Sequence, residues 1–133
     1  MKRILAGLFL LVLAFLIALP FLTHGQEKKR DAVPIDQAFW REEALRVLGT
    51  LFRGATAFPP GRGVWRDDER GGALVFDDTV LVTSYAAEQD CHEAAWRQLR
   101  AFLHRMGRDA RQGEIGLVLD GKYLGIDRYD PEP

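Results

Sequence analysis

The stretch TVLVTSY at residues 79–85 decides the fold, because its residues are mostly β-branched and aromatic, which is typical of a strand. Val80 and Val82 lie on one face of this predicted strand, and Leu81 and Tyr85 lie on the other. Since both faces are partly apolar, we expect it to be a central strand of a sheet.

Two helices flank this strand in the sequence. The first is expected at about residues 36–53, with Asp36 as its N-cap and Gly54 as its stop. The second follows Asp90, which forms a capping-box pattern with Glu93, and ends at Gly107. Each helix repeats apolar residues at helical spacing and so has one face to bury. The faces are Trp40, Ala44, Val47, Leu48 and Leu51, and Ala95, Leu99, Phe102, Leu103 and Met106.

Shorter strand candidates complete the pattern. Asp120-Gly121, between residues 115–119 and 122–126, predicts a hairpin, because a type I′ turn needs positive φ at both central positions. The other extended segments are residues 55–58, closed by Pro59-Pro60-Gly61, a piece that begins at Val64 and Trp65, and residues 73–76 after a turn at 66–72. The order predicts an α+β domain at residues 35–127 and a disordered tail at 128–133. We expect two helices on one face of a mostly antiparallel sheet of four or five strands.

A resemblance rests on motifs between about residues 36 and 85. These are Phe39-Trp40, Phe52, Gly54-Ala55-Thr56, Gly63-Val64-Trp65-Arg66-Asp67 and the TVLVTSY strand. Together they resemble the small ferredoxin-like domains of an uncharacterised bacterial family, with a G-x-T strand and a G-x-W-R-D hairpin. The resemblance implies a two-layer ferredoxin-like sandwich and no known reaction. The chain departs from the family where a first strand should precede the first helix, with only residues 32–35 available, and where a hairpin replaces a single last strand.

The N-terminal segment carries a separate signal. From Ile4 to Leu22, 17 of 19 residues are apolar and none is charged. A helix of that length spans roughly 28 Å, close to the thickness of a hydrocarbon core. We therefore expect a transmembrane anchor within residues 1–23, with a cleaved signal peptide as the alternative, and a polar tether at 24–34. A chain that begins at Gln26 should then be a soluble domain.

The expected location follows from this anchor. We predict a single-pass protein of the plasma membrane that contacts the bilayer through residues 4–22, with its domain outside the cytoplasm. Cleavage would instead give a secreted or periplasmic domain. Basic residues flank the segment on both sides, so a cytoplasm-facing domain is a further alternative.

Charge and cysteine content exclude some classes of function. The chain has 18 basic and 19 acidic residues, which argues against a nucleic-acid partner. Its one cysteine, Cys91, cannot form an intrachain disulfide. Edge pairing of a small sheet makes a homodimer an open alternative.

No catalytic residue, metal site or cofactor is predicted. Cys91 and His92 are neighbours at a helix start, but adjacent helical residues do not face each other. His92 and His104 are 12 residues apart in one helix, roughly 18 Å along its axis, and cannot bind one ion together. Asp67-Asp68-Glu69 and Asp77-Asp78 are interpreted as solvated turn residues, because acid–base catalysis needs two carboxyls in different environments of one cleft.

Arginines form the one candidate ligand site. Arg62 and Arg66 flank Trp65 in the glycine-rich hairpin, while others follow the end of the second helix. If the fold joins the two segments, the guanidinium groups and the indole would bind an anionic ligand or an acidic protein segment. The alternative is that the helix-end arginines only satisfy the helix dipole. The candidate site comprises Arg62, Trp65, Arg66, Arg105, Arg108 and Arg111.

The sequence favours a non-enzymatic, membrane-anchored domain that associates with a protein or a small ligand at the membrane surface. Two alternatives stay open. The first is an enzyme, a hydrolase or transferase, with an unrecognised site of arginines and acidic residues. The second is a secreted ligand-binding domain whose leader is removed.

Overall fold

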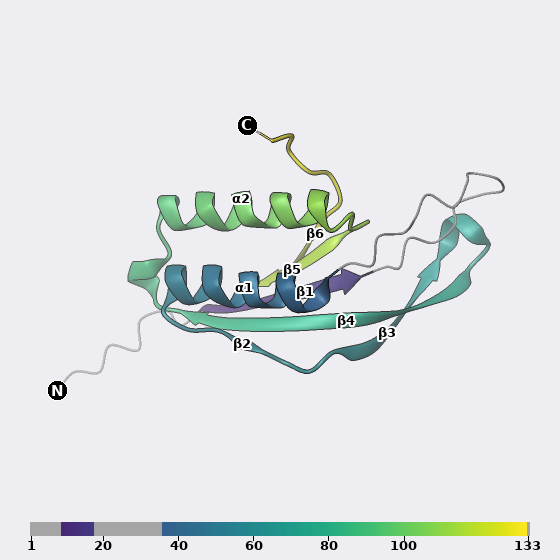
Figure 1. The fold of residues 1–133 in the computed structure, drawn as a ribbon, viewed down its shortest axis with the longest axis horizontal. Coiled ribbons are helices and arrows are strands. Elements are labelled where there is room, and N and C mark those ends of the chain that lie inside the picture. The colour runs from purple at the N-terminus through teal and green to yellow at the C-terminus, as the bar shows by residue number, and fades with distance from the viewer. Residues whose placement is uncertain (1–8, 18–35, 133) are drawn as a thin grey trace.

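The computed structural model describes residues 9–17 and 36–132. Two helices lie on one face of a six-stranded sheet (Figure 1). The helices are α1 (Gln37–Phe52) and α2 (Glu93–Asp109), and two short 3-10 helices are η1 (Asp68–Arg70) and η2 (Glu88–Asp90). The strands are β1 (Phe9–Ile17), β2 (Thr56–Ala57), β3 (Gly61–Asp67), β4 (Ala73–Ala86), β5 (Ile115–Leu119) and β6 (Lys122–Ile126). The predicted α+β class is confirmed, and the arrangement is consistent with a ferredoxin-like fold. The sheet has six strands rather than the expected four or five, because Phe9–Ile17 adds a strand.

The sheet is antiparallel and is built around β4. Its strand order is β2-β4-β1-β5-β6, and β3 also pairs with β4. The TVLVTSY stretch lies within β4, which has β1 on one side and both β2 and β3 on the other. It is therefore a central strand, as the sequence predicts. The far ends of β3 and β4 continue as a two-stranded ribbon beyond the helices (Figure 1).

The N-terminal strand differs from the sequence expectation. Residues Phe9–Ile17, predicted as part of a membrane helix, form β1 and pair with both β4 and β5. This strand supplies the element that the sequence did not find before the first helix. The sequence of a strand in the interior of a sheet is a continuous apolar run, so hydrophobicity alone does not distinguish such a strand from a helix. The remainder of residues 1–23 and the expected tether at 24–34 lie outside the described residues.

No helix in the described part of the chain has the length and apolar character needed to span a bilayer.

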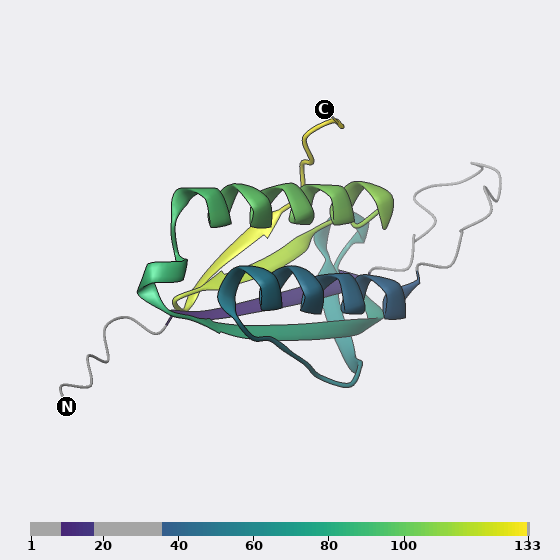
Figure 2. The same cartoon turned by 60° about the vertical axis from the view of Figure 1, so that its left-hand side comes forward.

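The core lies between the helices and one face of the sheet. Leu48 and Phe52 of α1 and Leu103 of α2 are almost fully buried against Val80 and Val82 of β4. Strand residues alternate in direction, so every second residue of β4 meets the helices. Among residues 9–17 and 36–132, no helix lies on the other face of the sheet (Figures 1 and 2). We call it the open face.

Details at the helix ends confirm part of the expected signals. Asp36 caps α1 by accepting a hydrogen bond from the Phe39 backbone N–H at 2.9 Å. The left-handed residue after α1 is Arg53, with φ 71°, rather than Gly54. The N-cap of α2 is His92, whose Nδ1 accepts from the Ala95 N–H at 3.2 Å, rather than Asp90. Asp90 lies two residues earlier, in η2. Gly107, the expected end of the second helix, lies inside α2, and the C-cap is Ala110.

The hairpin between β5 and β6 is confirmed. Asp120 and Gly121 have φ values of 49° and 76°, as a type I′ turn requires.

The C-terminal segment is docked, where the sequence predicts disorder from residue 128. The Asp130 N–H donates to Nδ1 of His104 at 2.7 Å, and its carboxylate pairs with Arg100 at 2.9 Å. Tyr129 packs against the helix at Gly107, where a Cβ would lie 2.0 Å from the tyrosine ring. A polar segment is thus ordered by long-range contacts that have no local sequence signal.

Replacing Gly107 by alanine is expected to detach this segment. Alanine normally stabilises a helix interior by about 1 kcal/mol over glycine. Here the added methyl group overlaps Tyr129, so we expect a net loss of about 1–3 kcal/mol. Gly49→Ala in α1 is the matched control, because no atom lies within 4 Å of its added Cβ. Chemical denaturation should show Gly107→Ala less stable and Gly49→Ala equal or more stable than the natural chain. Equal stability of the two variants would contradict the docking.

His104 is expected to make the fold sensitive to acid. Burial lowers its pKa from 6.5, and Arg100 lowers it further. Its Nδ1 accepts a hydrogen bond, so the neutral ring is the form that docks Asp130. The unfolded chain therefore binds a proton more readily than the folded chain. As the pH falls from about 6.5, the ordinary pKa of histidine, to the lowered pKa of the folded state, the contribution of His104 to stability is lost. Melting at pH 7.5 and 5.5 should show a larger drop for the natural chain than for His104→Asn. Equal drops would contradict this role.

Candidate functional site

The two groups of predicted arginines lie apart. Arg62 and Arg66 are on β3. In Figure 1, α1 and β4 lie between β3 and α2. The Arg62 guanidinium lies 5.0 Å from the centre of the Phe76 ring. Arg66 pairs with Asp68 at 2.5 Å. Alternation along β3 places Trp65 on the other face of the ribbon, away from both arginines.

The helix-end arginines each have a separate environment. Arg105 pairs with Glu43 of α1 at 2.8 Å, and its guanidinium lies over the rings of Trp40 and Phe102. Arg108 donates to the backbone oxygen of Asp130 and so holds the C-terminal segment. Arg111 is exposed in the turn after α2, with φ 50°. The structure does not join these residues with β3 into one guanidinium-rich surface.

The remaining reactive side chains give no nucleophile or metal centre. Burial raises the pKa of the Cys91 thiol, and the carboxylates of Asp90 and Glu88 raise it further. A protonated thiol is a poor nucleophile. Within residues 9–17 and 36–132, no group of three or more His, Cys, Asp or Glu side chains could hold a metal ion.

The most unusual polar group is Asp77, in the middle of β4. Its side chain lies on the open face, yet the residue is only 3% exposed. One carboxylate oxygen, Oδ1, accepts a hydrogen bond from the Thr79 hydroxyl at 3.2 Å. No described group donates to the other oxygen, Oδ2, which is fully buried. A buried carboxylate oxygen without a donor is costly and needs a physical explanation.

The opposite strand is shaped around this carboxylate. Gly63 of β3 is the cross-strand partner of Asp77. A Cβ at Gly63 would lie 2.2 Å from Asp77 Oδ1 and 2.6 Å from the Thr79 hydroxyl oxygen, so only glycine fits there. Gly61 is the cross-strand partner of Thr79, and Trp65, paired with Val75, is the next residue of β3 after Gly63 on the same face. Asp77, Thr79, Gly61, Gly63 and Trp65 together form what we call the Asp77 site.

Sequence reasoning missed this site. The sequence predicts that Asp77 and Asp78 are solvated turn residues, but both lie inside the 14-residue strand β4. Asp78 is exposed and faces the helix side, while Asp77 is buried on the opposite face. The usable signal was that the apolar segments at 73–76 and 79–85 continue on both sides of the acidic pair, so one strand could span them.

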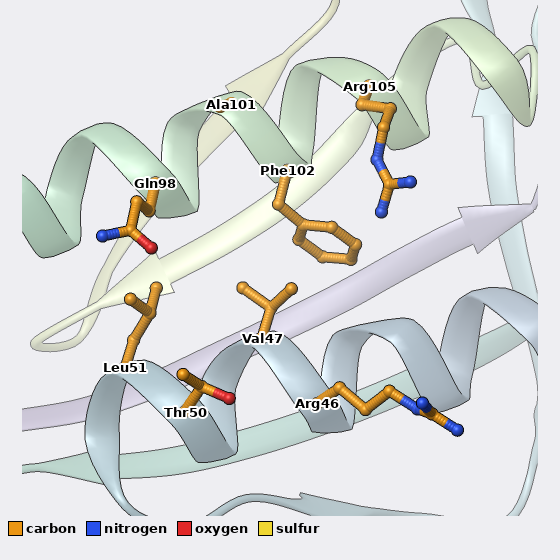
Figure 3. Close-up of a pocket in the computed structure, with 8 residues that line it drawn as sticks. All are labelled: Arg46, Val47, Thr50, Leu51, Gln98, Ala101, Phe102 and Arg105. Carbon is orange, nitrogen blue, oxygen red and sulfur yellow. The ribbon is translucent and has the colours of Figure 1, made fainter.

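A second concave feature lies between α1 and α2, on the outer surface of the helical layer. This interhelical groove has a volume of about 420 Å³. Phe102 and Val47 face each other in its middle, with Arg105 and Arg46 towards one end (Figure 3). The other residues that line it are Thr50, Leu51, Gln98 and Ala101.

Comparisons with known proteins show similarity in fold alone. No protein-family model matches the chain, and no curated protein matches it. The resemblance to an uncharacterised bacterial family therefore stays a prediction. A phage SAM lyase in complex with S-methyl-5′-thioadenosine is similar in structure, with a TM-score of 0.57 and 15% identity over 96% of this chain and 95% of the other. The apo form of a phage SAM lyase gives a TM-score of 0.56 at 14% identity, covering 99% and 98%.

These neighbours correct the function favoured by the sequence. Both are enzymes that span nearly the whole of this chain, whereas the sequence favoured a non-enzymatic association domain at a membrane surface.

Proposed function

We propose that the chain is an enzyme that acts on a small sulfonium compound of the S-adenosylmethionine class at the Asp77 site. The observation that carries the proposal is the buried Oδ2 of Asp77, which has no donor among the described residues. A buried negative charge of this kind is stabilised by a cationic ligand. The structural neighbours support a cationic substrate, because they are SAM lyases and the sulfur of SAM is positively charged.

The surroundings of Asp77 support a ligand rather than an internal partner. The Asp77 carboxylate and the Thr79 hydroxyl occupy the space beside Gly63, whereas no side chain fills the space beside Gly61. Trp65 lies one cross-strand pair away on the same face, and it is 36% exposed. Same-face neighbours on adjacent strands are within reach of a large aromatic side chain. A cation at Asp77 would therefore also meet an indole ring, which attracts positive charge.

The loss of positive charge on sulfur during the reaction gives Asp77 a role in substrate binding. When a carbon–sulfur bond of a sulfonium breaks, the bonding electron pair moves to sulfur and the positive charge on sulfur disappears. The carbon that loses sulfur then either bonds to a nucleophile, such as the substrate's own carboxylate, or gains a double bond as a neighbouring proton leaves. A carboxylate beside the sulfur thus stabilises the substrate more than the later stages of the reaction. We expect Asp77 to contribute mainly to substrate affinity and to the choice of a cation over a neutral molecule.

The test is the conversion of SAM by the full-length chain. The purified protein is incubated with SAM, and S-methyl-5′-thioadenosine is measured by chromatography and mass spectrometry. S-adenosylhomocysteine, which has the same nucleoside but a neutral sulfur, serves as the binding comparison. We expect SAM to be consumed and to bind more tightly than S-adenosylhomocysteine. If SAM is not consumed and the two bind equally, the proposal is wrong.

A further inference from the structure

The interhelical groove combines an apolar floor with a positively charged end. The floor comes from Val47 and Leu51 of α1 and from Ala101 and Phe102 of α2. Its volume of about 420 Å³ lies within the range of small-molecule sites. The two helices do not close over this space, so part of their apolar surface stays available to a ligand.

The two arginines at the end of the groove differ in how they are held. Arg105 is fixed by Glu43 at 2.8 Å and by the Trp40 and Phe102 rings, at 5.4 and 5.9 Å from its guanidinium carbon. Within the described chain, Arg46 has no ion-pair partner. Glu43 offsets one of the two positive charges, and no residue that lines the groove is acidic. This end therefore carries a net positive charge that its own walls do not neutralise.

The opposite end is polar but uncharged. Thr50 lies one helical turn after Arg46, and Gln98 lies two turns before Arg105, roughly 10 Å along the helix axis. Figure 3 shows both near Leu51, away from the guanidinium groups. The groove is thus charged at one end and apolar in its middle. That order matches a chain-like molecule with a negatively charged head.

We propose that the interhelical groove binds a small amphiphilic carboxylate, with the head at Arg46 and Arg105 and the apolar chain on Phe102, Val47 and Leu51. A guanidinium binds a carboxylate through paired charge-assisted hydrogen bonds. The fixed Arg105 supplies an ordered donor group, and Arg46 supplies the charge that lacks a partner. The groove is on the helix side of the sheet and the Asp77 site is on the open face, so this ligand is separate from the proposed substrate.

Three probes with the same eight-carbon chain test the role of the head group. Octanoate, octanol and octylamine are titrated into ¹⁵N-labelled full-length protein and followed by NMR. We expect octanoate to shift the amide resonances of residues 46–51 and 98–105 with one-to-one saturation, and the other two to cause small shifts without saturation. Equal binding of octylamine would overturn the proposal, because the charged end would then have no role.

Arg46→Gln tests the unpaired arginine directly. We expect it to weaken octanoate binding by about tenfold, since it removes one charge-assisted hydrogen-bonding group. Arg41→Gln, on the same helix but not in the groove, should leave the affinity unchanged. Both variants should melt at the temperature of the natural chain, which excludes a general loss of folding. Unchanged affinity in Arg46→Gln, or an equal loss in Arg41→Gln, would overturn the proposal. SAM turnover is measured separately and decides only the proposed function.

Discussion

A chain that begins at Gln26 is expected to be unfolded or aggregated. Such a chain lacks β1, which lies between β4 and β5 and pairs with both. Its loss divides the sheet into two parts and exposes two long strand edges. The domain has a typical total stability of only about 5–15 kcal/mol, so it should not survive the loss of a central strand.

The sequence interpretation predicts the opposite outcome for the same chain, because an anchor contributes nothing to the folding of the domain behind it. Circular dichroism and gel filtration distinguish the two results. A chain that ends at Asp130 is the control, since it loses only residues beyond the docked segment. A folded monomer beginning at Gln26, with a dispersed NMR spectrum, would contradict the role of β1 and support the anchor. The single-pass location, the orientation and a homodimer stay predictions of the sequence.

Asp77→Asn is expected to have the second largest effect, on substrate binding. It removes the negative charge and keeps the size of the side chain. Loss of a charge-assisted contact costs about 1.5–3 kcal/mol, which corresponds to a ten- to hundredfold higher KM for SAM. We expect kcat to change less, because the charge on sulfur is greatest in the substrate. The free energy of unfolding should not fall, because a buried charge without a donor is removed.

Asp78→Asn is the matched control for this measurement. Asp78 is the next residue of β4, but it is exposed on the opposite face of the ribbon. Its substitution should leave KM, kcat and stability unchanged. Gly63→Ala should mimic Asp77→Asn, since its methyl group would displace the Asp77 carboxylate. A lower stability of Asp77→Asn with unchanged KM would show that Asp77 is a structural residue.

The elements with local signals were predictable. The TVLVTSY strand, both helices and the Asp120-Gly121 hairpin are confirmed, because periodicity, caps and turn residues act over a few neighbouring positions. Arg53 in the left-handed region and His92 as N-cap differ from the predicted residues by only one or two positions. These differences do not change the fold.

The elements that depend on distant contacts were not predictable. Phe9–Ile17 belongs to an apolar run with the length and composition of a membrane helix, and its strand partners lie about 60 to 110 residues later in the chain. Asp77 resembled a turn residue because its burial depends on where the β3–β4 ribbon places it. The arginines of β3 and α2 are kept apart by the topology of the sheet. Each of these outcomes follows from tertiary structure.

The most direct test of the account is the register of β1 in the sheet that carries the Asp77 site. Cysteine pairs are introduced at Ala14 with Leu81 and at Leu13 with Val82, in a Cys91→Ser background. One of these adjacent pairs lies at a narrow, non-hydrogen-bonded position, where a disulfide can form. Ala14 with Tyr85 is the control, because these residues are four positions out of register.

Mild oxidation of the full-length protein, followed by peptide mass mapping, gives the answer. The account predicts an intrachain disulfide in an in-register pair and none in the control. Absence of an intrachain disulfide from both in-register pairs would contradict the placement of Phe9–Ile17 as the strand beside β4.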